Sequence, residues 1–288
     1  MLDKIKGGLF GVAVGDALGV SAEFLDPIQI KHLYGYITEI TGGGIFSFEK
    51  GEVSDDTDMT LAVARGILQQ PDNPYPFIGK EFLKWKETMP KDIGNTIDHV
   101  LTHYDGDWFF AAEQAHRSFG GKSAGNGSLM RVLPVALFYS DINEATRVAY
   151  YQSKMTHHDE LASEACVLYT KIAHHLLKGS ALSSSIEQEV KGTRYELVLH
   201  GEPSGNPDGF VVNSLQWSLY YLLSTSSYED LVQHCVNAGF DADTTAAIAG
   251  GLAGIYYGYS GIPSRYIQTL LDKDMIEQLS LELYKKRK

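Results

Sequence analysis

Two clusters of acidic and hydroxyl-bearing residues each stand directly ahead of a long apolar segment. The first is SDDTD at 54–58, and the second is DADTT at 241–245. Acidic side chains stabilise the start of a helix, but one capping side chain is normally enough, so each cluster holds more oxygen atoms than capping requires. Asp55 and Asp241 lie 186 positions apart (241 − 55), so local structure does not explain why the two clusters are alike.

A divalent cation explains the surplus of oxygen atoms if the two helix starts meet. The four carboxylates of Asp55, Asp56, Asp241 and Asp243 would then converge with two or three hydroxyls, and like charges at such short range cannot all remain ionised on their own. Oxygen ligands suit Mg²⁺, Mn²⁺ or Ca²⁺ rather than Zn²⁺, and neither cluster contains His or Cys. Because a bridging carboxylate can serve two ions, we expect a two-metal site. The alternative is a pair of ordinary helix caps, with Ser54 as the first.

The segment GNGS at 125–128 is a candidate for anion binding. Its small residues leave backbone N–H groups accessible where a helix is expected to begin, and such N–H groups bind phosphate. The preceding GKS at 121–123 is not a nucleoside-triphosphate loop, because the glycine required five positions earlier is His116. The alternative is a glycine-rich turn capped by Ser128. Arg131, one turn further on, would support an anion or pair with an acid.

Three isolated residues have ordinary structural interpretations when each is taken alone. Glu23 follows the first apolar segment and is typical of a surface glutamate. Asp92 stands where a helix N-cap is expected. His157 lies at a helix start without metal-binding spacing such as HExxH, which favours a structural hydrogen-bonding role.

Composition excludes several classes of protein. With 24 Lys plus Arg against 36 Asp plus Glu, the net charge of −12 opposes non-specific binding to nucleic acid or to acidic lipid. The two cysteines, Cys166 and Cys235, form no CxxC motif, so neither a disulfide framework nor a zinc knuckle is expected. Asp16 interrupts what otherwise resembles a signal peptide, and 244–259 is too short for a membrane span. We therefore expect a soluble cytoplasmic protein.

Helical periodicity dominates the chain, and no segment alternates with the period of a strand. The 288 residues contain no charged linker, low-complexity tract or repeat, so we expect one compact all-α domain over 1–288. The expected helices are 3–19, 54–70, 77–89, 93–104, 108–118, 127–139, 142–155, 158–178, 181–190, 209–224, 228–238, 242–258 and 264–286.

Taken together, these segments resemble the ADP-ribosylglycohydrolase family, which includes the dinitrogenase reductase-activating glycohydrolases. The resemblance implies an all-α fold with a dinuclear Mg²⁺ or Mn²⁺ centre that cleaves ADP-ribose from a modified side chain or a related conjugate. It spans about residues 5–260 and is carried, in order, by GVAVGDALGVSAEF (11–24), SDDTDMTLAVA (54–64), GNGSLMRVLPVA (125–136), THHDELA (156–162) and GFDADTTAAIAGGLAGIYYG (239–258).

The resemblance also implies roles for individual residues. Glu23 matches the acid near the scissile ribose, Asp92 corresponds to an acid implicated in ring chemistry, and Asp56 completes the catalytic candidates. The implied metal ligands are Ser54, Asp55, Asp56, Asp241, Asp243 and Thr244. The implied substrate-binding residues are Gly125, Asn126, Gly127, Ser128, Met130, His157 and Phe240.

The second acidic cluster departs from the family pattern at two positions. Phe240 stands where the second glycine of Gly-Gly-Asp-Thr-Asp-Thr is usual, and Ala242 replaces the intervening threonine. Neither change removes a carboxylate, so metal binding should persist. A phenyl ring beside the site would reshape the pocket for the leaving group.

The sequence thus predicts a metal-dependent hydrolase of the bond between ADP-ribose and a modified side chain. Arginine is the expected target, and serine or another conjugate stays open; the expected partner is an ADP-ribosylated protein or a small ADP-ribose conjugate. One alternative is a non-catalytic ADP-ribose-binding or crystallin-like structural protein. Another is a Mg²⁺-dependent helical prenyl-diphosphate enzyme, although the DDxxD motif typical of that class is interrupted at Met59. Oligomeric state is not indicated.

Overall fold

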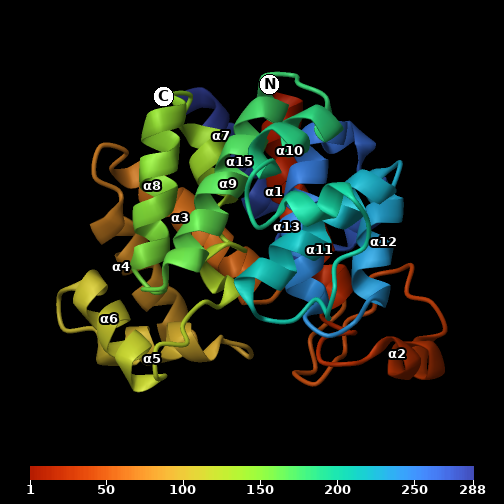
Figure 1. Ribbon diagram of the computed structural model, residues 1–288, viewed down its shortest axis with the longest axis horizontal. Helices are drawn as coiled ribbons and strands as arrows, with labels where there is room; N and C mark the ends of the chain where they lie inside the picture. Colours follow the sequence, from red (N-terminus) through yellow and green to blue (C-terminus); the bar gives the residue numbers. More distant parts are fainter.

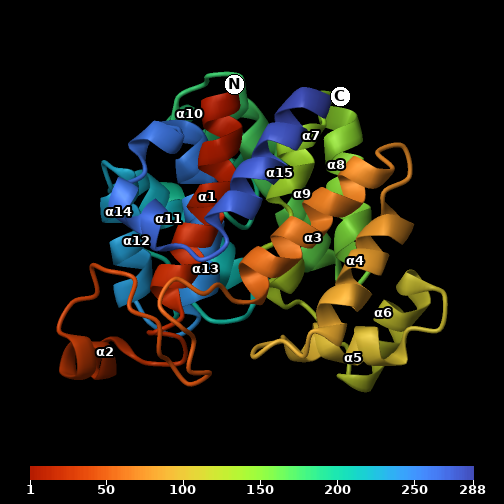
Figure 2. The same ribbon diagram turned by 180° about the vertical axis from the view of Figure 1, so that it is seen from behind.

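Helices α1 (Leu2–Gly19) and α13 (Ala242–Tyr257) lie side by side through the middle of the molecule (Figures 1 and 2). Every residue of α1 from Gly7 onward is buried, and so is every residue of α13 up to Ile255. A helix that is apolar all round, without a single apolar stripe, is typical of a position inside the core. This pair of helices is therefore the centre of the fold.

Glycines let the backbones of α1 and α13 touch. A Cβ atom on Gly11 would lie 2.2 Å from the carbonyl oxygen of Gly250, and one on Gly250 would lie 2.3 Å from that of Gly11. At the far end of α1, a Cβ on Gly19 would lie 2.3 Å from Cα of Asp243. The absence of side chains thus holds the end of α1, four residues before Glu23, against the first turn of α13.

The structure is a computed structural model that describes residues 1–288, of which 66% are helical. Two isolated β-bridges, Gly43 with Phe48 and Gly125 with Phe210, are the only extended pairings. The remaining helices are α2 (Pro27–Tyr34), α3 (Asp55–Gln69), α4 (Tyr75–Glu87), α5 (Asn95–His103), α6 (Trp108–Ser118), α7 (Leu133–Phe138), α8 (Ile142–Lys154), α9 (Glu160–Leu177), α10 (Leu182–Val190), α11 (Val211–Ser224), α12 (Tyr228–Asn237), α14 (Ser264–Thr269) and α15 (Lys273–Lys286).

The central pair is enclosed by six other helices. Helices α3, α7 and α15 contact α1, while α9, α11 and α12 contact α13. Both chain termini lie at one end of the molecule, and α2, α5 and α6 lie at the opposite end, with α2 at a different corner from the other two (Figures 1 and 2). The end of α1 that leads to Glu23 therefore lies among these outer helices.

One apolar core extends through the whole chain. Eighty buried residues form a single contiguous cluster, so the fold is one compact unit and not two domains. This confirms the predicted all-α fold. No helix combines the length and the apolar character that crossing a lipid bilayer would require.

Two predicted helices are interrupted in the structure. The segment 127–139 begins as a 3₁₀ turn (Asn126–Ser128), and α7 starts only at Leu133, because Pro134 has no N–H for a helix interior and fits the first turn of a new helix. The segment 264–286 divides into α14 and α15, since Leu271 leaves the helix and donates its N–H to the carbonyl of Gly51.

Helix α2 is absent from the helices expected from the sequence. Asp26 caps it, accepting from the N–H groups of Ile28 and Gln29 at 2.8 Å, while the Gln29 side chain accepts from the Asp26 N–H. These reciprocal bonds form a capping box, and Pro27 at the first helical position also favours the helix start. The start signal is present in the sequence, but only Ile30 of this helix is buried, so the apolar periodicity that reveals most helices is weak.

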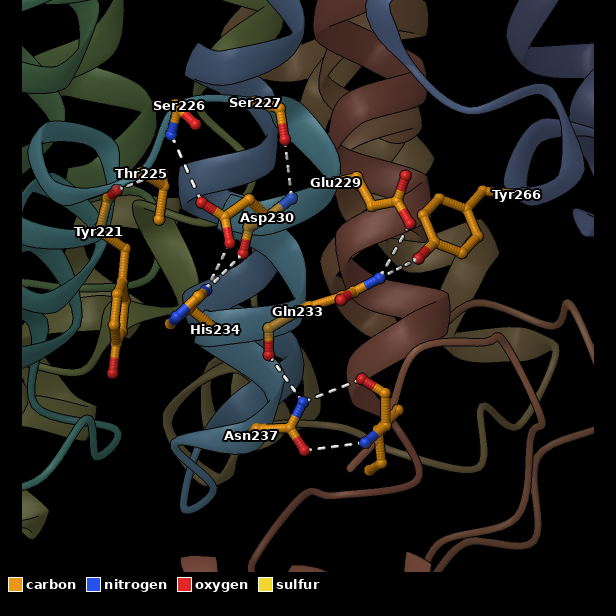
Figure 3. A network of polar contacts seen from close by, with 11 residues as sticks. Tyr221, Thr225, Ser226, Ser227, Glu229, Asp230, Gln233, His234, Asn237 and Tyr266 are labelled. Atoms are coloured by element: carbon orange, nitrogen blue, oxygen red, sulfur yellow. Dashed lines mark hydrogen bonds and ion pairs between the residues drawn. The ribbon is translucent and has the colours of Figure 1, made fainter. Parts of the chain in front are cut away.

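A polar network on α12 fixes the irregular segment 35–53 that follows α2 (Figure 3). The Asn237 side chain accepts from the N–H of Ile37 and donates to its carbonyl, both at 2.9 Å. The hydroxyl of Tyr266 donates to the carbonyl of Thr38 at 2.6 Å and accepts from Gln233 at 2.9 Å. These bonds tie the start of the segment to the helical body, and Phe46 of the same segment lines the cavity described next.

Candidate active site

A cavity of about 590 Å³ lies where the first turns of α3 and α13 meet. The segments that flank α2 and the segment that leads into α5 contribute to its wall, together with the start of α3 and the Gly125 loop. Five acids line it and no Lys or Arg does: the acids are Glu23, Asp55, Asp92, Asp208 and Asp241. The cavity is thus strongly electronegative, and any anion inside it must be bound by neutral donors or by a cation that enters with it.

The two acidic clusters are in direct contact. Thr244 Oγ1 donates to Asp56 Oδ2 at 3.1 Å, and Ser54 Oγ donates to the same oxygen at 3.2 Å. Asn126 Nδ2 donates to Asp241 Oδ2 at 2.6 Å and ties the second cluster to the glycine loop. The tertiary structure therefore brings together the two helix starts.

Two acids from other parts of the chain join the clusters. Carboxylate oxygens of Glu23, Asp92 and Asp243 all lie within 4.8 Å of one another. Asp55 Oδ2 accepts from the N–H of Gly94 at 3.3 Å, which places the loop before α5 beside the start of α3. Glu23 and Asp92, which look like unrelated surface and capping residues in the sequence, therefore lie at one site.

Burial strongly disfavours the ionised form of these carboxyls. It raises the pKa of Glu23 to about 9, with the negative charge of Asp92 as the next contribution. It also raises the pKa of Asp55, Asp56 and Asp243 well above the usual carboxyl range. Such a site either holds protons at neutral pH or binds cations in their place.

The donor set fits a hard divalent cation. One oxygen each of Glu23, Asp56 and Asp243 is buried without any hydrogen-bond partner. An unpartnered buried carboxylate oxygen is costly, and a metal ion is the partner that an all-oxygen site with no His or Cys ligand would accept. The acidic cluster is therefore capable of holding metal.

Asp16 supports this site, although neither cluster contains it. It is a fully buried carboxylate on α1 that accepts from the N–H groups of Ser54 at 3.0 Å and Thr57 at 3.1 Å, and also from the Thr57 hydroxyl. Asp16 thereby caps α3 from another helix and orients Ser54. Burial raises the pKa of Asp16 to about 7. The sequence carries one signal for it, an acid inside a segment of otherwise apolar and small residues.

Asp58, the third acid of the first cluster, connects α3 to α4 by a hydrogen bond. Its Oδ2 accepts from the indole N–H of Trp85 at 3.0 Å, and it does not line the cavity. Burial raises the pKa of Asp58 to about 6.

The glycine loop passes directly over His157. A Cβ on Gly125 would lie 3.3 Å from His157 Nε2, and one on Gly127 would lie 3.2 Å from His157 Cε1 and 2.8 Å from the Ile97 side chain. The lack of side chains therefore keeps this wall of the cavity open beside the imidazole. Met130 lines the same region.

Two residues of this segment point away from the cavity. Ser128 is fully buried, and its hydroxyl bonds to Ser153 Oγ at 2.8 Å instead of facing the cavity. Arg131 is also fully buried, and it neither lines the cavity nor pairs with a carboxylate. The segment therefore presents backbone, and no positive side chain, to a ligand.

Phe240 lines the cavity next to the second cluster, as its place in the sequence suggests. It has a positive φ of 59°, the conformation that the usual glycine at this position would adopt without strain. Its N–H donates to Leu25 O at 2.7 Å and its carbonyl accepts from the N–H of Phe24 at 2.6 Å. These two bonds hold the strained backbone and set Phe24 and Phe240 together at the Glu23 end of the cavity.

The whole chain, residues 1–288, matches the family described as ADP-ribosylglycohydrolase. The chain belongs to the ADP-ribosylglycohydrolase family. The resemblance predicted from the motifs is thereby confirmed, and the family identifies the chain as an ADP-ribosyl glycohydrolase, an enzyme. Neither the crystallin-like alternative nor the prenyl-diphosphate alternative is supported.

Relatives of this ADP-ribosylglycohydrolase are similar over nearly the full length of this chain. ADP-ribosyl-(dinitrogen reductase) glycohydrolase from Rhodospirillum rubrum is 32% identical, covering 93% of this chain and 90% of the relative. ADP-ribosylarginine hydrolase Tri1 from Pseudomonas putida is 29% identical, covering 98% and 78%. A solved structure described as an ADP-ribosylglycohydrolase-related protein complex has a TM-score of 0.87 at 29% identity, covering 100% of this chain and 99% of that chain.

Proposed function

We propose that this enzyme hydrolyses the bond between ADP-ribose and a modified arginine side chain, with two divalent cations, Mg²⁺ or Mn²⁺, as cofactors. The observation that carries the proposal is the meeting of two distant acidic clusters at one electronegative cavity, with carboxylate oxygens left unpartnered. The ligands proposed for the metal ions are Ser54, Asp55, Asp56, Asp241, Asp243 and Thr244. Bound there, the ions would supply Lewis-acid and template effects on ribose hydroxyls and water.

Glu23 is the proposed acid and base of the reaction. Hydrolysis breaks the bond between the anomeric carbon and the leaving nitrogen or oxygen through an oxocarbenium-like state, while a water oxygen forms the new bond. In its protonated form the Glu23 carboxyl would protonate the leaving group, and in its ionised form it would accept the proton of the water. Asp92 lies within 4.8 Å and is the second candidate for these proton transfers.

The diphosphate of the substrate would lie along the glycine loop. The N–H of Asn126 donates to the carbonyl of Gly209 at 3.1 Å, whereas the N–H groups of Gly127 and Ser128 have no acceptor in the protein. His157 adds a ring nitrogen beside Gly125 and Gly127. Phosphate binding by backbone N–H groups accounts for an anionic ligand in a cavity without Lys or Arg.

Arginine is the proposed leaving group because a guanidinium matches the other end of the cavity. Glu23 and Asp92 are acidic there, and the rings of Phe24, Phe46 and Phe240 line the same cavity. A planar cation is attracted to carboxylates and to aromatic faces together. Two relatives are named ADP-ribosylarginine hydrolases, which supports the same linkage.

Both cysteines are free and buried, which is consistent with the cytoplasm as the place of action.

The test is hydrolysis of peptides that carry mono-ADP-ribosylated arginine or serine, each with Mg²⁺, with Mn²⁺ and with EDTA. We expect metal-dependent release of ADP-ribose from the arginine peptide. Release from the serine peptide alone would replace the linkage but keep the reaction. Tight binding of ADP-ribose without release from either peptide would overturn the hydrolase proposal and favour a binding protein.

A further inference from the structure

Arg131 is a buried cation whose partners are all neutral. Its Nε donates to Gln152 Oε1 at 3.1 Å, and its Nη2 donates to the Gln152 carbonyl at 3.2 Å and to Thr156 Oγ1 at 2.7 Å. The guanidinium carbon lies 4.5 Å from the centre of the Phe82 ring. A charge without a carboxylate partner is costly to bury, so stability alone does not account for an arginine at this position.

The contacts of Thr156 extend from Arg131 to His157. Thr156 Oγ1 is fully buried and lies 2.8 Å from His157 Nδ1. Arg131 and His157 are its only two hydrogen-bond partners. A guanidinium has only donors, so the Thr156 oxygen must accept from Arg131. The single proton of the hydroxyl then has one acceptor within reach, His157 Nδ1.

This order of donors and acceptors determines the imidazole tautomer. If His157 instead carried its proton on Nδ1, the Thr156 oxygen would accept twice and its own buried proton would have no partner. The ring therefore accepts at Nδ1, and as a neutral imidazole it carries its proton on Nε2. Burial, and next the charge of Arg131, lower the pKa of His157 to about 3, so the ring is neutral at physiological pH.

The other nitrogen of the ring faces the substrate side. His157 lines the cavity, and its Nε2 makes no hydrogen bond within the protein. Nε2 lies beside the glycines of the 125–128 loop, 3.3 Å from where a Cβ of Gly125 would be. The N–H at this position is a donor aimed at a ligand, whereas the other tautomer would present a lone pair that repels a phosphate oxygen.

We infer that Arg131 and Thr156 are positioning residues that hold His157 as an Nε2–H donor, so that a neutral ring binds the diphosphate of ADP-ribose where no Lys or Arg is present. The part of this inference that concerns ADP-ribose rests on the proposed function. The part that concerns the tautomer does not, because it is a property of the free protein.

The first test is the ¹⁵N spectrum of the histidine rings in the free protein, with the His157 signals assigned by their loss in His157→Gln. We expect a protonated Nε2 and an unprotonated, hydrogen-bonded Nδ1, unchanged in Thr156→Ser. In Thr156→Val, which removes the hydroxyl and keeps the shape, the Nδ1 signal should move to the position of a nitrogen without a donor. A proton on Nδ1 in the native protein would overturn the inference.

The second test is the affinity for ADP-ribose by calorimetry. We expect Kd to rise about tenfold in Thr156→Val and to stay near the native value in Thr156→Ser. In the His157→Gln background, Thr156→Val should have no further effect, because it acts through the ring. An equal Kd in native and Thr156→Val proteins, or an equal loss from Thr156→Val in both backgrounds, would overturn the positioning role.

The two readouts separate the failure of this inference from failure of the proposed function. If the native protein neither binds nor hydrolyses ADP-ribose conjugates, the proposed function fails and the ring spectrum still decides the tautomer. If the native protein binds ADP-ribose and the variants do not differ, only the positioning inference fails.

Discussion

At the scale of single residues, the proposed chemistry depends on carboxyl groups that lie close together but differ in their hydrogen-bond partners. Glu23 lies at the cavity, has a buried oxygen without a partner and has a pKa raised to about 9. Asp16 lies beneath the cavity and uses both oxygens to hold the start of α3. In the proposed mechanism, Glu23 exchanges protons and Asp16 orients the metal ligands.

Replacing Glu23 with Gln should therefore slow hydrolysis without weakening binding. The amide keeps the size of the side chain but cannot exchange a proton, so we expect kcat to fall by about 10²-fold or more while Kd for ADP-ribose stays within about threefold. Single-turnover kinetics and calorimetry measure the two quantities. An unchanged kcat would remove Glu23 from the mechanism.

Replacing Asp16 with Asn should weaken metal binding while the protein stays folded. The amide presents an N–H₂ group to backbone donors that the carboxylate now accepts from, so Ser54 and the first turn of α3 lose their orientation. Loss of such a supporting group typically reduces metal affinity about 10- to 100-fold.

Asp58→Asn is the matched control for Asp16→Asn. Asp58 belongs to the same helix start, but its carboxylate bonds to Trp85 instead of the site. The test is Mn²⁺ affinity by calorimetry, with circular dichroism to verify the fold. Equal losses of affinity in the two variants would contradict a specific role for Asp16.

At the scale of elements, the contact between α1 and α13 decides whether the acidic clusters meet. The two helices approach so closely because glycine faces carbonyl oxygen at Gly11 and Gly250, and the same alignment places the end of α1 on Asp243. Separation of the two helices would move Glu23 away from the second cluster. The glycines therefore matter for the site as well as for packing.

Gly11→Ala should destabilise the protein by about 2 kcal/mol or more, since the new Cβ would lie 2.2 Å from a backbone oxygen that cannot move independently. Gly8→Ala, the same change on the same helix, meets side-chain carbons and no backbone atom, at 3.2 and 3.3 Å, and should be nearly neutral. Urea denaturation measures both. If Gly11→Ala were as stable as Gly8→Ala, the close contact would not govern this packing.

At the scale of the whole molecule, the site connects folding stability to pH and to divalent cations. Asp16 and Glu23 have pKa values raised to about 7 and about 9, so between pH 4 and these values the folded protein binds more protons than the unfolded chain. Unfolding then releases protons, and stability falls as pH rises. Cations that replace the protons should remove this loss.

We therefore expect the Tm in EDTA to fall between pH 6.5 and pH 8, and the increase in Tm caused by Mg²⁺ or Mn²⁺ to be larger at pH 8 than at pH 6.5. This range begins at the ordinary pKa of histidine, 6.5, and extends above it, so the lowered pKa of His157 contributes little. Differential scanning calorimetry at the two pH values measures the effect. A metal-induced increase that is the same at both would contradict proton release from these carboxyls.

The sequence by itself determined the helical class, most helix positions and the residue types of the site. These features are local. Apolar periodicity reveals a helix with a buried face, and more acids than one helix cap needs can be recognised within five consecutive residues. The same local reading missed α2, which buries only Ile30, and it joined α14 to α15, because the break at Leu271 depends on the carbonyl of Gly51.

Only the tertiary structure decided which of the candidate residues meet and which side chains support them. Asp56 reaches Thr244 across 188 positions, and Asp16 reaches Ser54 across 38. Ser128 lies in a promising loop, yet it turns into the core. The direction of a side chain and the partner of a buried polar group depend on helices packed from elsewhere in the chain, and no spacing within one segment encodes them.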